Sequence, residues 1–188
     1  MNHKFIRVQF EGVKFVSATL ENVSFKNCVF RNVDFTGAKM DDVDLTKAVL
    51  IDAVFEGAIL TELNFEEANF KGANFKGVKC RDSTFFRAKF KDANLTGADL
   101  FQASMFGVQF NGAILIDACL QFAGLAESVF EAVDLTDADL SGAELMETTF
   151  IDANLTGANL EDSNLHKANF KGANFKGANL YIIYKFPD

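Results

Sequence analysis

The sequence repeats a five-residue pattern, and this period limits the possible folds more than any other feature. Every residue whose number is divisible by five, from Phe5 to Leu180, is an apolar residue that we call a centre. All centres are Phe or Leu apart from Met40, Met105 and Cys80. The residue two positions before a centre is usually Ala or Val, and the residue between them is often Asn or Asp, as in residues 153–160. Such self-similarity at a fixed period is the signature of a repeat architecture.

A period of five fits neither regular secondary structure. On a helix, five residues turn by about 500°, so successive centres would drift by about 140° and form no common face. On a strand, five residues reverse the face, because side chains alternate with a period of two. The centres can all point inward only if the chain bends once in each repeat. The sequence therefore predicts a coil made of short extended pieces and corners.

Centres that are four repeats apart are alike, which indicates that four repeats close one coil. The column of centres that starts at Phe10 is Phe at every position except Leu50, whereas the column that starts at Leu20 contains no Phe. Bulky and less bulky residues would then face each other across a narrow, closely packed interior. An inserted residue would shift all later centres into other columns, and the similarity within each column would be lost. We therefore expect no loop between the first centre and the last, and a buried side chain at every centre.

Glycine marks one of the four corners. The residues at this corner, two positions after the centres of one column, are Gly37, Gly57, Gly77, Gly97, Gly157 and Gly177. Because Gly adopts a positive φ without steric cost, we expect a turn with a left-handed residue at this corner. The other corners carry mainly charged and amide residues, so the four corners need not share one type of turn.

The repeat resembles the consensus of the pentapeptide-repeat family, A-(D/N)-L-x-x, and the resemblance extends from about residue 3 to residue 180. It implies an all-β fold, a right-handed quadrilateral parallel β-helix (solenoid) of about nine four-sided coils with no internal loops. Leu or Phe would be stacked inside. On this basis we expect one β-helix domain over residues 1–180. A scaffold of this kind serves several roles, so the resemblance implies little about function.

The repeat stops after the last centre, and residues 181–188 are apolar at positions that were polar before. The last coil of a solenoid exposes its core and an unpaired strand edge, which proteins cover. We therefore expect this tail to cap the rod, or alternatively to form a homodimer through the C-terminal end. The residues available for either role are Tyr181, Ile182, Ile183, Tyr184 and Phe186.

Side chains suited to catalysis are few. The only histidines are His3 and His166, and no Ser–His–acid set, glycine-rich phosphate loop or metal-ligand cluster accompanies them. The three cysteines have the spacing of neither a disulfide framework nor a zinc motif, so we expect free thiols. The sequence shows no secretory signal and no apolar run of about 20 residues. We therefore expect a cytoplasmic protein that is not an enzyme, holds no cofactor or metal, and contacts neither nucleic acid directly nor a membrane.

Four phenylalanines depart from the repeat between residues 86 and 122. These four, which fall in outward register, are Phe86, Phe101, Phe106 and Phe122. Phe86 and Phe106 are four repeats apart and should stack on neighbouring coils. Exposed apolar clusters often mark partner-binding sites. The four rings could also form a simple surface ladder, or be covered by the tail of another chain.

A line of acidic residues follows one corner. Asp42, Glu62 and Asp82 occupy this corner on successive coils, and Asp162 lies on the same line. Regular negative charge along a rod could imitate the phosphates of DNA, and the family members linked to quinolone resistance are thought to act on DNA gyrase in this way. Residues 102, 122 and 142 interrupt the line, and basic residues cluster beside it. A solvated acidic surface is the commoner meaning of such charge.

Two functional hypotheses follow from these surfaces. The first is a non-enzymatic protein–protein interaction or scaffold module, whose protein partner is unknown. The alternative is a DNA-mimicking modulator of DNA gyrase. Charge spacing favours the first, because DNA carries one charge per roughly 1.7 Å of its axis. The acidic line offers only one carboxylate per coil, about every 4.8 Å.

Overall fold

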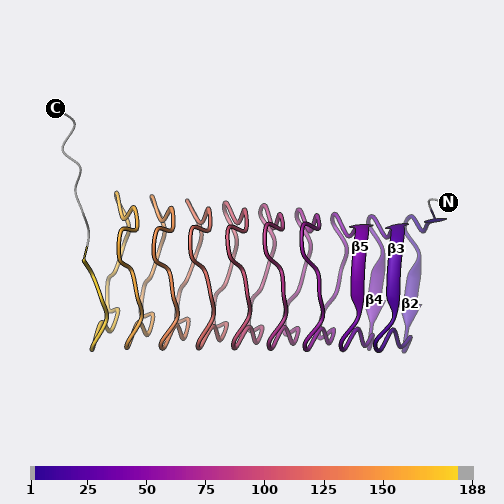
Figure 1. The fold of residues 1–188 in the computed structure, drawn as a ribbon, viewed down its shortest axis with the longest axis horizontal. Coiled ribbons are helices and arrows are strands. Elements are labelled where there is room, and N and C mark those ends of the chain that lie inside the picture. The colour runs from indigo at the N-terminus through magenta and orange to yellow at the C-terminus, as the bar shows by residue number, and fades with distance from the viewer. Residues whose placement is uncertain (1–2, 182–188) are drawn as a thin grey trace.

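The computed structural model describes residues 3–181, which form a rod of stacked coils (Figure 1). Five short strands lie in the N-terminal part of the rod: β1 (His3–Lys4), β2 (Gln9–Glu11), β3 (Thr19–Ser24), β4 (Val29–Arg31) and β5 (Lys39–Asp44). They form two parallel sheets, in the orders β1-β3-β5 and β2-β4. Beyond β5 the coils pair through single parallel bridges. Residues 3–181 contain no helix, and hence none that could cross a membrane.

All pairings share one register. Phe10 in β2 pairs with Phe30 in β4, and the last bridge joins Asn159 to Asn179, so each partner lies four repeats further along the chain. Four repeats therefore close one coil, as the columns of centres predicted. No residue is inserted between the first pairing and the last. The chain forms a β-helix in which each side of one coil lies against the same side of the next.

Residues 73–77 show how one repeat satisfies its backbone. The amides of Asn74, Phe75 and Gly77 donate to carbonyls of neighbouring coils at 2.7–2.9 Å. The amide of Ala73 donates to the carbonyl of the preceding centre at 3.0 Å and closes the corner. The remaining amide, that of Lys76, donates to Oδ1 of Asn74 at 3.1 Å. Every N–H of the repeat has a partner, as buried backbone requires, and the Asn or Asp before a centre supplies one of the acceptors.

Every corner contains a left-handed residue. The residue two positions after each centre from Phe5 to Phe175 has a positive φ, with values between 49° at Asp42 and 75° at Gly172. The glycine corner therefore has the positive φ that the sequence predicted, but it shares this feature with the other three corners. Gly, Asn and Asp tolerate the conformation best. The fold also imposes it on residues such as Lys47 and Phe122.

The centres form a continuous core. Every centre from Phe25 to Leu160 is buried. In the Phe-rich column the rings stack on successive coils, with ring centroids 4.7 Å apart for Phe110 and Phe130 and 5.0 Å apart for Phe130 and Phe150. Burial of each Phe or Leu contributes about 1.5–3 kcal/mol relative to exposure. The inward residues of the repeat therefore supply the main favourable term in folding.

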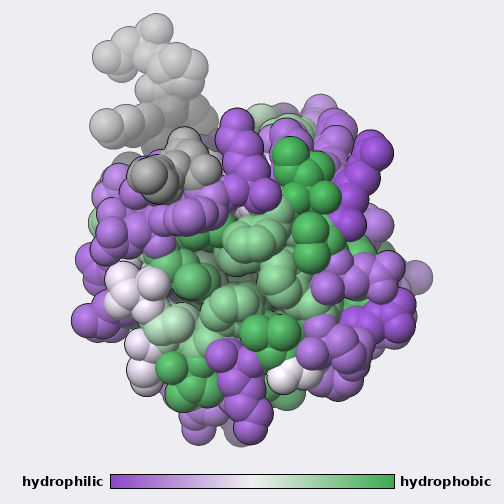
Figure 2. All heavy atoms as spheres, turned by 90° about the vertical axis from the view of Figure 1, so that its right-hand side faces the viewer, coloured by the Kyte–Doolittle hydropathy of each residue, from purple (hydrophilic) through white to green (hydrophobic). Residues whose placement is uncertain are grey.

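The prediction that every centre is buried is wrong at the two ends of the rod. Phe5 is 39% exposed and Leu180 is 44% exposed, because no further coil covers them within the described residues. Figure 2 looks at the N-terminal end and shows an apolar surface in its middle, ringed by hydrophilic side chains. Of the predicted tail, Tyr181 is described and is 65% exposed. The other tail residues, Ile182, Ile183, Tyr184 and Phe186, lie outside the described residues.

A side chain closes the corner at Leu63. This residue takes a position that is usually Ala or Val, and its amide does not donate to the carbonyl of Leu60. Ser83, one coil further on, donates its hydroxyl to that carbonyl at 2.7 Å and accepts from the Leu63 amide at 3.1 Å. Leu60, Leu63 and Ser83 are all buried. The hydroxyl therefore replaces the backbone hydrogen bond that closes most other corners.

The substitution Ser83→Ala should lower the free energy of unfolding by about 1–3 kcal/mol, because it leaves a buried carbonyl and a buried amide without partners. Ser163→Ala is the matched control. The Ser163 hydroxyl also reaches a carbonyl, that of Leu160 at 2.8 Å, but the Ser163 amide donates to the same oxygen at 3.2 Å. Chemical denaturation measures both losses. Equal losses would show that Ser83 does not close the corner.

Candidate interaction surface

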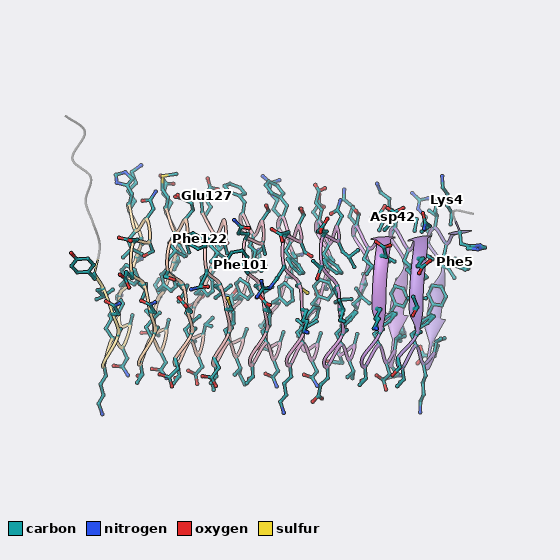
Figure 3. The ribbon with its side chains drawn as sticks, in the orientation of Figure 1. Lys4, Phe5, Asp42, Phe101, Phe122 and Glu127 are labelled. Carbon is teal, nitrogen blue, oxygen red and sulfur yellow. The ribbon has the colours of Figure 1, made fainter. Side chains whose placement is uncertain are left out.

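The four outward phenylalanines form two pairs on neighbouring corners of the rod. Phe86 and Phe106 each follow a centre directly, and their rings stack with centroids 5.1 Å apart. Phe101 and Phe122 lie on the preceding corner, and their rings meet edge to face at 5.8 Å. Figure 3 shows this second pair beside one another midway along the rod. We call the four residues together the aromatic surface.

Phe122 is the most exposed residue of the aromatic surface. Its side chain is 56% exposed, whereas the other three are half-buried. It occupies the left-handed corner position with a φ of 55°, which costs a residue other than Gly roughly 1–3 kcal/mol. Its ring lies over Gly142 on the next coil, where a Cβ would stand 2.5 Å from ring carbons. The ring can occupy this place because residue 142 has no side chain.

An arginine accompanies each pair of rings. The Arg81 guanidinium lies 5.2 Å from the centroid of the Phe101 ring, and the Arg87 guanidinium lies 5.2 Å from that of Phe86. Both are within reach of a cation–π interaction. Arg81 also donates to Asp99 at 2.5 Å, and this hydrogen bond raises the pKa of the guanidinium. Arg87 has no acidic partner among residues 3–181.

The side of the rod between the two corners carries small residues. Thr84, Ser104 and Gly124 follow one another on successive coils and are joined by parallel bridges. They are the outward residues of the side whose corners carry the aromatic surface. A partner can therefore approach the backbone closely between the two pairs of rings.

The acidic line is exposed along its corner. Asp42, Glu62, Asp82 and Asp162 are all exposed, and each has a φ between 49° and 59°. Asp is among the residues that tolerate this conformation best, so the backbone already accounts for part of this composition. Gln102, Phe122 and Gly142 separate Asp162 from the other three. The structure therefore presents three acidic residues in sequence rather than a continuous row.

The remaining reactive groups are dispersed. His3 and His166 are exposed and lie near opposite ends of the rod. The thiols of Cys28, Cys80 and Cys119 are free, and burial raises the pKa of each. A thiol with a raised pKa is mostly protonated and is a poor nucleophile. In the described part of the chain, no group of three His, Cys, Asp or Glu side chains is placed to hold a metal ion.

Sequence reasoning did not connect three residues that shape this surface with the phenylalanines: Arg81, Arg87 and Gly142. A signal existed for two of them, because Arg81 stands four repeats before Phe101 and Gly142 stands four repeats after Phe122. The contact of Arg87 with Phe86 joins adjacent residues, and no spacing marks it. The prediction that Phe86 and Phe106 stack agrees with their geometry.

Comparisons with known proteins agree with the fold. The family model "Pentapeptide repeat region" matches residues 1–75 and 30–105, and the model "Pentapeptide repeats (8 copies)" matches residues 113–150 and 143–181. No curated protein matches the chain by sequence. One similar solved structure is HetL, a pentapeptide repeat protein involved in heterocyst differentiation regulation from the cyanobacterium Nostoc sp. strain PCC 7120. The two are 25% identical with a TM-score of 0.51, over 95% of this chain and 85% of HetL.

A second similar structure is that of a trypsin-treated variant of QnrB1, a plasmid-mediated fluoroquinolone resistance protein. It is 19% identical with a TM-score of 0.53, over 93% of this chain and 90% of that one. At this identity the likeness concerns the fold. The two family models together cover residues 1–105 and 113–181, which include most of the paired coils and most of the aromatic surface. The chain therefore belongs to the pentapeptide-repeat family.

Proposed function

We propose that the chain is a non-enzymatic interaction module that presents the aromatic surface to a protein partner. Its scaffold is a right-handed coil of about nine turns, as the family resemblance implies, and neighbouring coils hold the surface residues in fixed positions. The matching family models describe a repeat and no reaction. The observation that carries the proposal is the exposure of Phe122 on a left-handed backbone.

Phe122 contributes little to folding where it stands. The residue is 56% exposed and its φ is 55°, so Asn or Gly at this position would relieve backbone strain, and only the partly buried portion of the ring would be lost. In protein interfaces, by contrast, aromatic side chains that become buried against a partner carry much of the binding energy. Binding therefore explains this residue better than stability does.

The substitution Phe122→Asn should abolish partner binding while it leaves the free energy of unfolding unchanged or slightly raised. Asn tolerates the left-handed conformation, so the corner is preserved when the ring is removed. Asp162→Asn is the matched control, because residue 162 stands on the same corner with a φ of 54°. Affinity capture from an extract of the native host, together with chemical denaturation, measures both properties.

The opposite pattern would contradict the proposal. If Phe122→Asn unfolded at markedly lower denaturant concentration but still captured the same proteins as the Asp162→Asn control, Phe122 would be a structural residue. The aromatic surface would then be a ladder of rings that supports the coils.

A second candidate function rests on the acidic line. Asp42, Glu62 and Asp82 are exposed on successive coils, and the fold resembles that of QnrB1, a fluoroquinolone resistance protein. A DNA-mimicking modulator of DNA gyrase would need such a row. The row ends after three coils, and its spacing of about 4.8 Å is wider than the roughly 1.7 Å per charge of DNA. This candidate is therefore the weaker one.

Gyrase supercoiling assays separate the two candidates. We expect the purified protein to leave supercoiling unchanged, and the triple variant Asp42→Lys, Glu62→Lys, Asp82→Lys to behave like the wild type, because the row is too short and too sparse to compete with DNA. Stoichiometric inhibition by the wild type that disappears in the triple variant would instead establish DNA mimicry.

A further inference from the structure

We propose that the partner of the aromatic surface is a second copy of this chain, docked side to side with the two rods antiparallel. The inference rests on the proposed function, because it names the partner of the same surface. It follows from the arrangement of large, small and charged residues on three successive coils.

These three coils carry the docking face, which comprises the two corners of the aromatic surface and the side between them. The first coil contributes residues 81–87, the middle coil residues 101–107 and the third coil residues 121–127. The amide of Arg87 donates to the carbonyl of Phe106 at 2.9 Å, and the amide of Gly107 donates to the carbonyl of Ala126 at 3.0 Å. The coils are thereby fixed in register, about 4.8 Å apart. Residues of the docking face therefore stand at three defined levels.

On the corner of Phe86 and Phe106, and on the side between the two corners, the docking face is complementary to itself. A twofold axis that crosses the rod at the middle coil brings the first coil of one copy against the third coil of the other, and each contact then occurs twice. The pairs that meet are Phe86 with Ala126, Thr84 with Gly124, and Arg87 with Glu127. In the first two pairs a larger side chain faces a smaller one. In the third a positive charge faces a negative one.

The middle coil places a projecting ring beside a hollow. The half-buried ring of Phe106 stands next to Gly107, where a hollow lies between Arg87 and Glu127 and extends onto the following side of the rod, along Lys89, Gln109 and Val129. A Cβ at residue 107 would have only the Cγ of Arg87 near it, at 3.5 Å, so the hollow is open. Because the twofold axis crosses this coil, the antiparallel dimer brings Phe106 of one copy against Phe106 of the other, with a hollow beside each ring.

The charges favour this orientation. Arg87 and Glu127 are exposed, and neither has an ion-pair partner among residues 3–181. The acids of the flanking coils are already paired within the chain, Glu67 with Lys47 at 3.3 Å and Glu147 with Lys167 at 2.9 Å. Parallel docking would instead bring Arg87 towards Arg81 of the partner subunit. Opposed like charges disfavour an association, so the antiparallel arrangement is preferred.

Disulfide trapping tests the predicted contact directly. Two full-length variants are prepared with Cys119→Ser, one with Arg87→Cys and the other with Glu127→Cys. In a dimer of either variant alone, the two introduced cysteines lie two coils apart, about 9.6 Å, which exceeds the reach of about 7 Å between Cα atoms of a disulfide. A dimer that contains one copy of each variant has two contacts between residues 87 and 127. One of them becomes Cys–Cys, while the other keeps its Arg87–Glu127 pair.

We expect mild oxidation to produce a covalent dimer from the mixture and little from either variant alone. Equal dimer yields in the mixture and in the separate variants would overturn the proposed contact, as would the absence of any covalent dimer. The native thiols Cys28 and Cys80 are buried and give little background.

Sedimentation equilibrium provides a second test. Phe106→Ser and Arg87→Glu should each weaken dimerisation about tenfold or more, and Arg87→Glu combined with Glu127→Arg should restore it, because the double change re-forms the charge pair. A wild type that stays monomeric would overturn the second copy as partner, even if Phe122→Asn still lost capture of another protein. A dimer that all these variants leave intact would place self-association elsewhere, for example at the C-terminal end.

Discussion

The structure depends on a left-handed backbone at one residue in every five. This residue turns the chain at each corner, so that the next centre also points inward even though five residues of strand would reverse the face. From Arg7 to Gly177 no corner lacks it. Its steric cost for residues other than Gly is offset by what the corner permits. Each centre from Phe25 to Leu160 is buried, and most backbone amides of a repeat pair with neighbouring coils.

Much of this architecture could be predicted from the period alone. The similarity of centres four repeats apart anticipated the pairing of Phe10 with Phe30, and the inward register anticipated the core from Phe25 to Leu160. The ends departed from the prediction, because a centre such as Phe5 is buried only if another coil covers it. The glycine pattern revealed one corner out of four, since hydrogen bonding between coils imposes a positive φ whatever residue the sequence supplies.

The outward positions were harder to interpret, because the fold places few demands on them. A spacing of four repeats brought Phe86 and Phe106 together, but the diagonal contact of Phe101 with Phe122 depends on the path of the chain around a corner. The role of Ser83 was equally hidden, because its hydroxyl acts on a carbonyl one coil away. These same free positions hold the aromatic surface, so the candidate binding site lies where the repeat does not determine the residue.

The corner account is tested most directly by removing one Cβ at two nearby alanines and measuring the free energy of unfolding. Ala132 has a φ of 53°, whereas Ala126 is not among the left-handed residues. Ala132→Gly should stabilise the protein by up to about 1 kcal/mol, because relief of the left-handed strain exceeds the added entropy of the unfolded chain. Ala126→Gly should destabilise it by about 0.5–1 kcal/mol. Equal destabilisation by both substitutions would contradict the view that left-handed corners govern this fold.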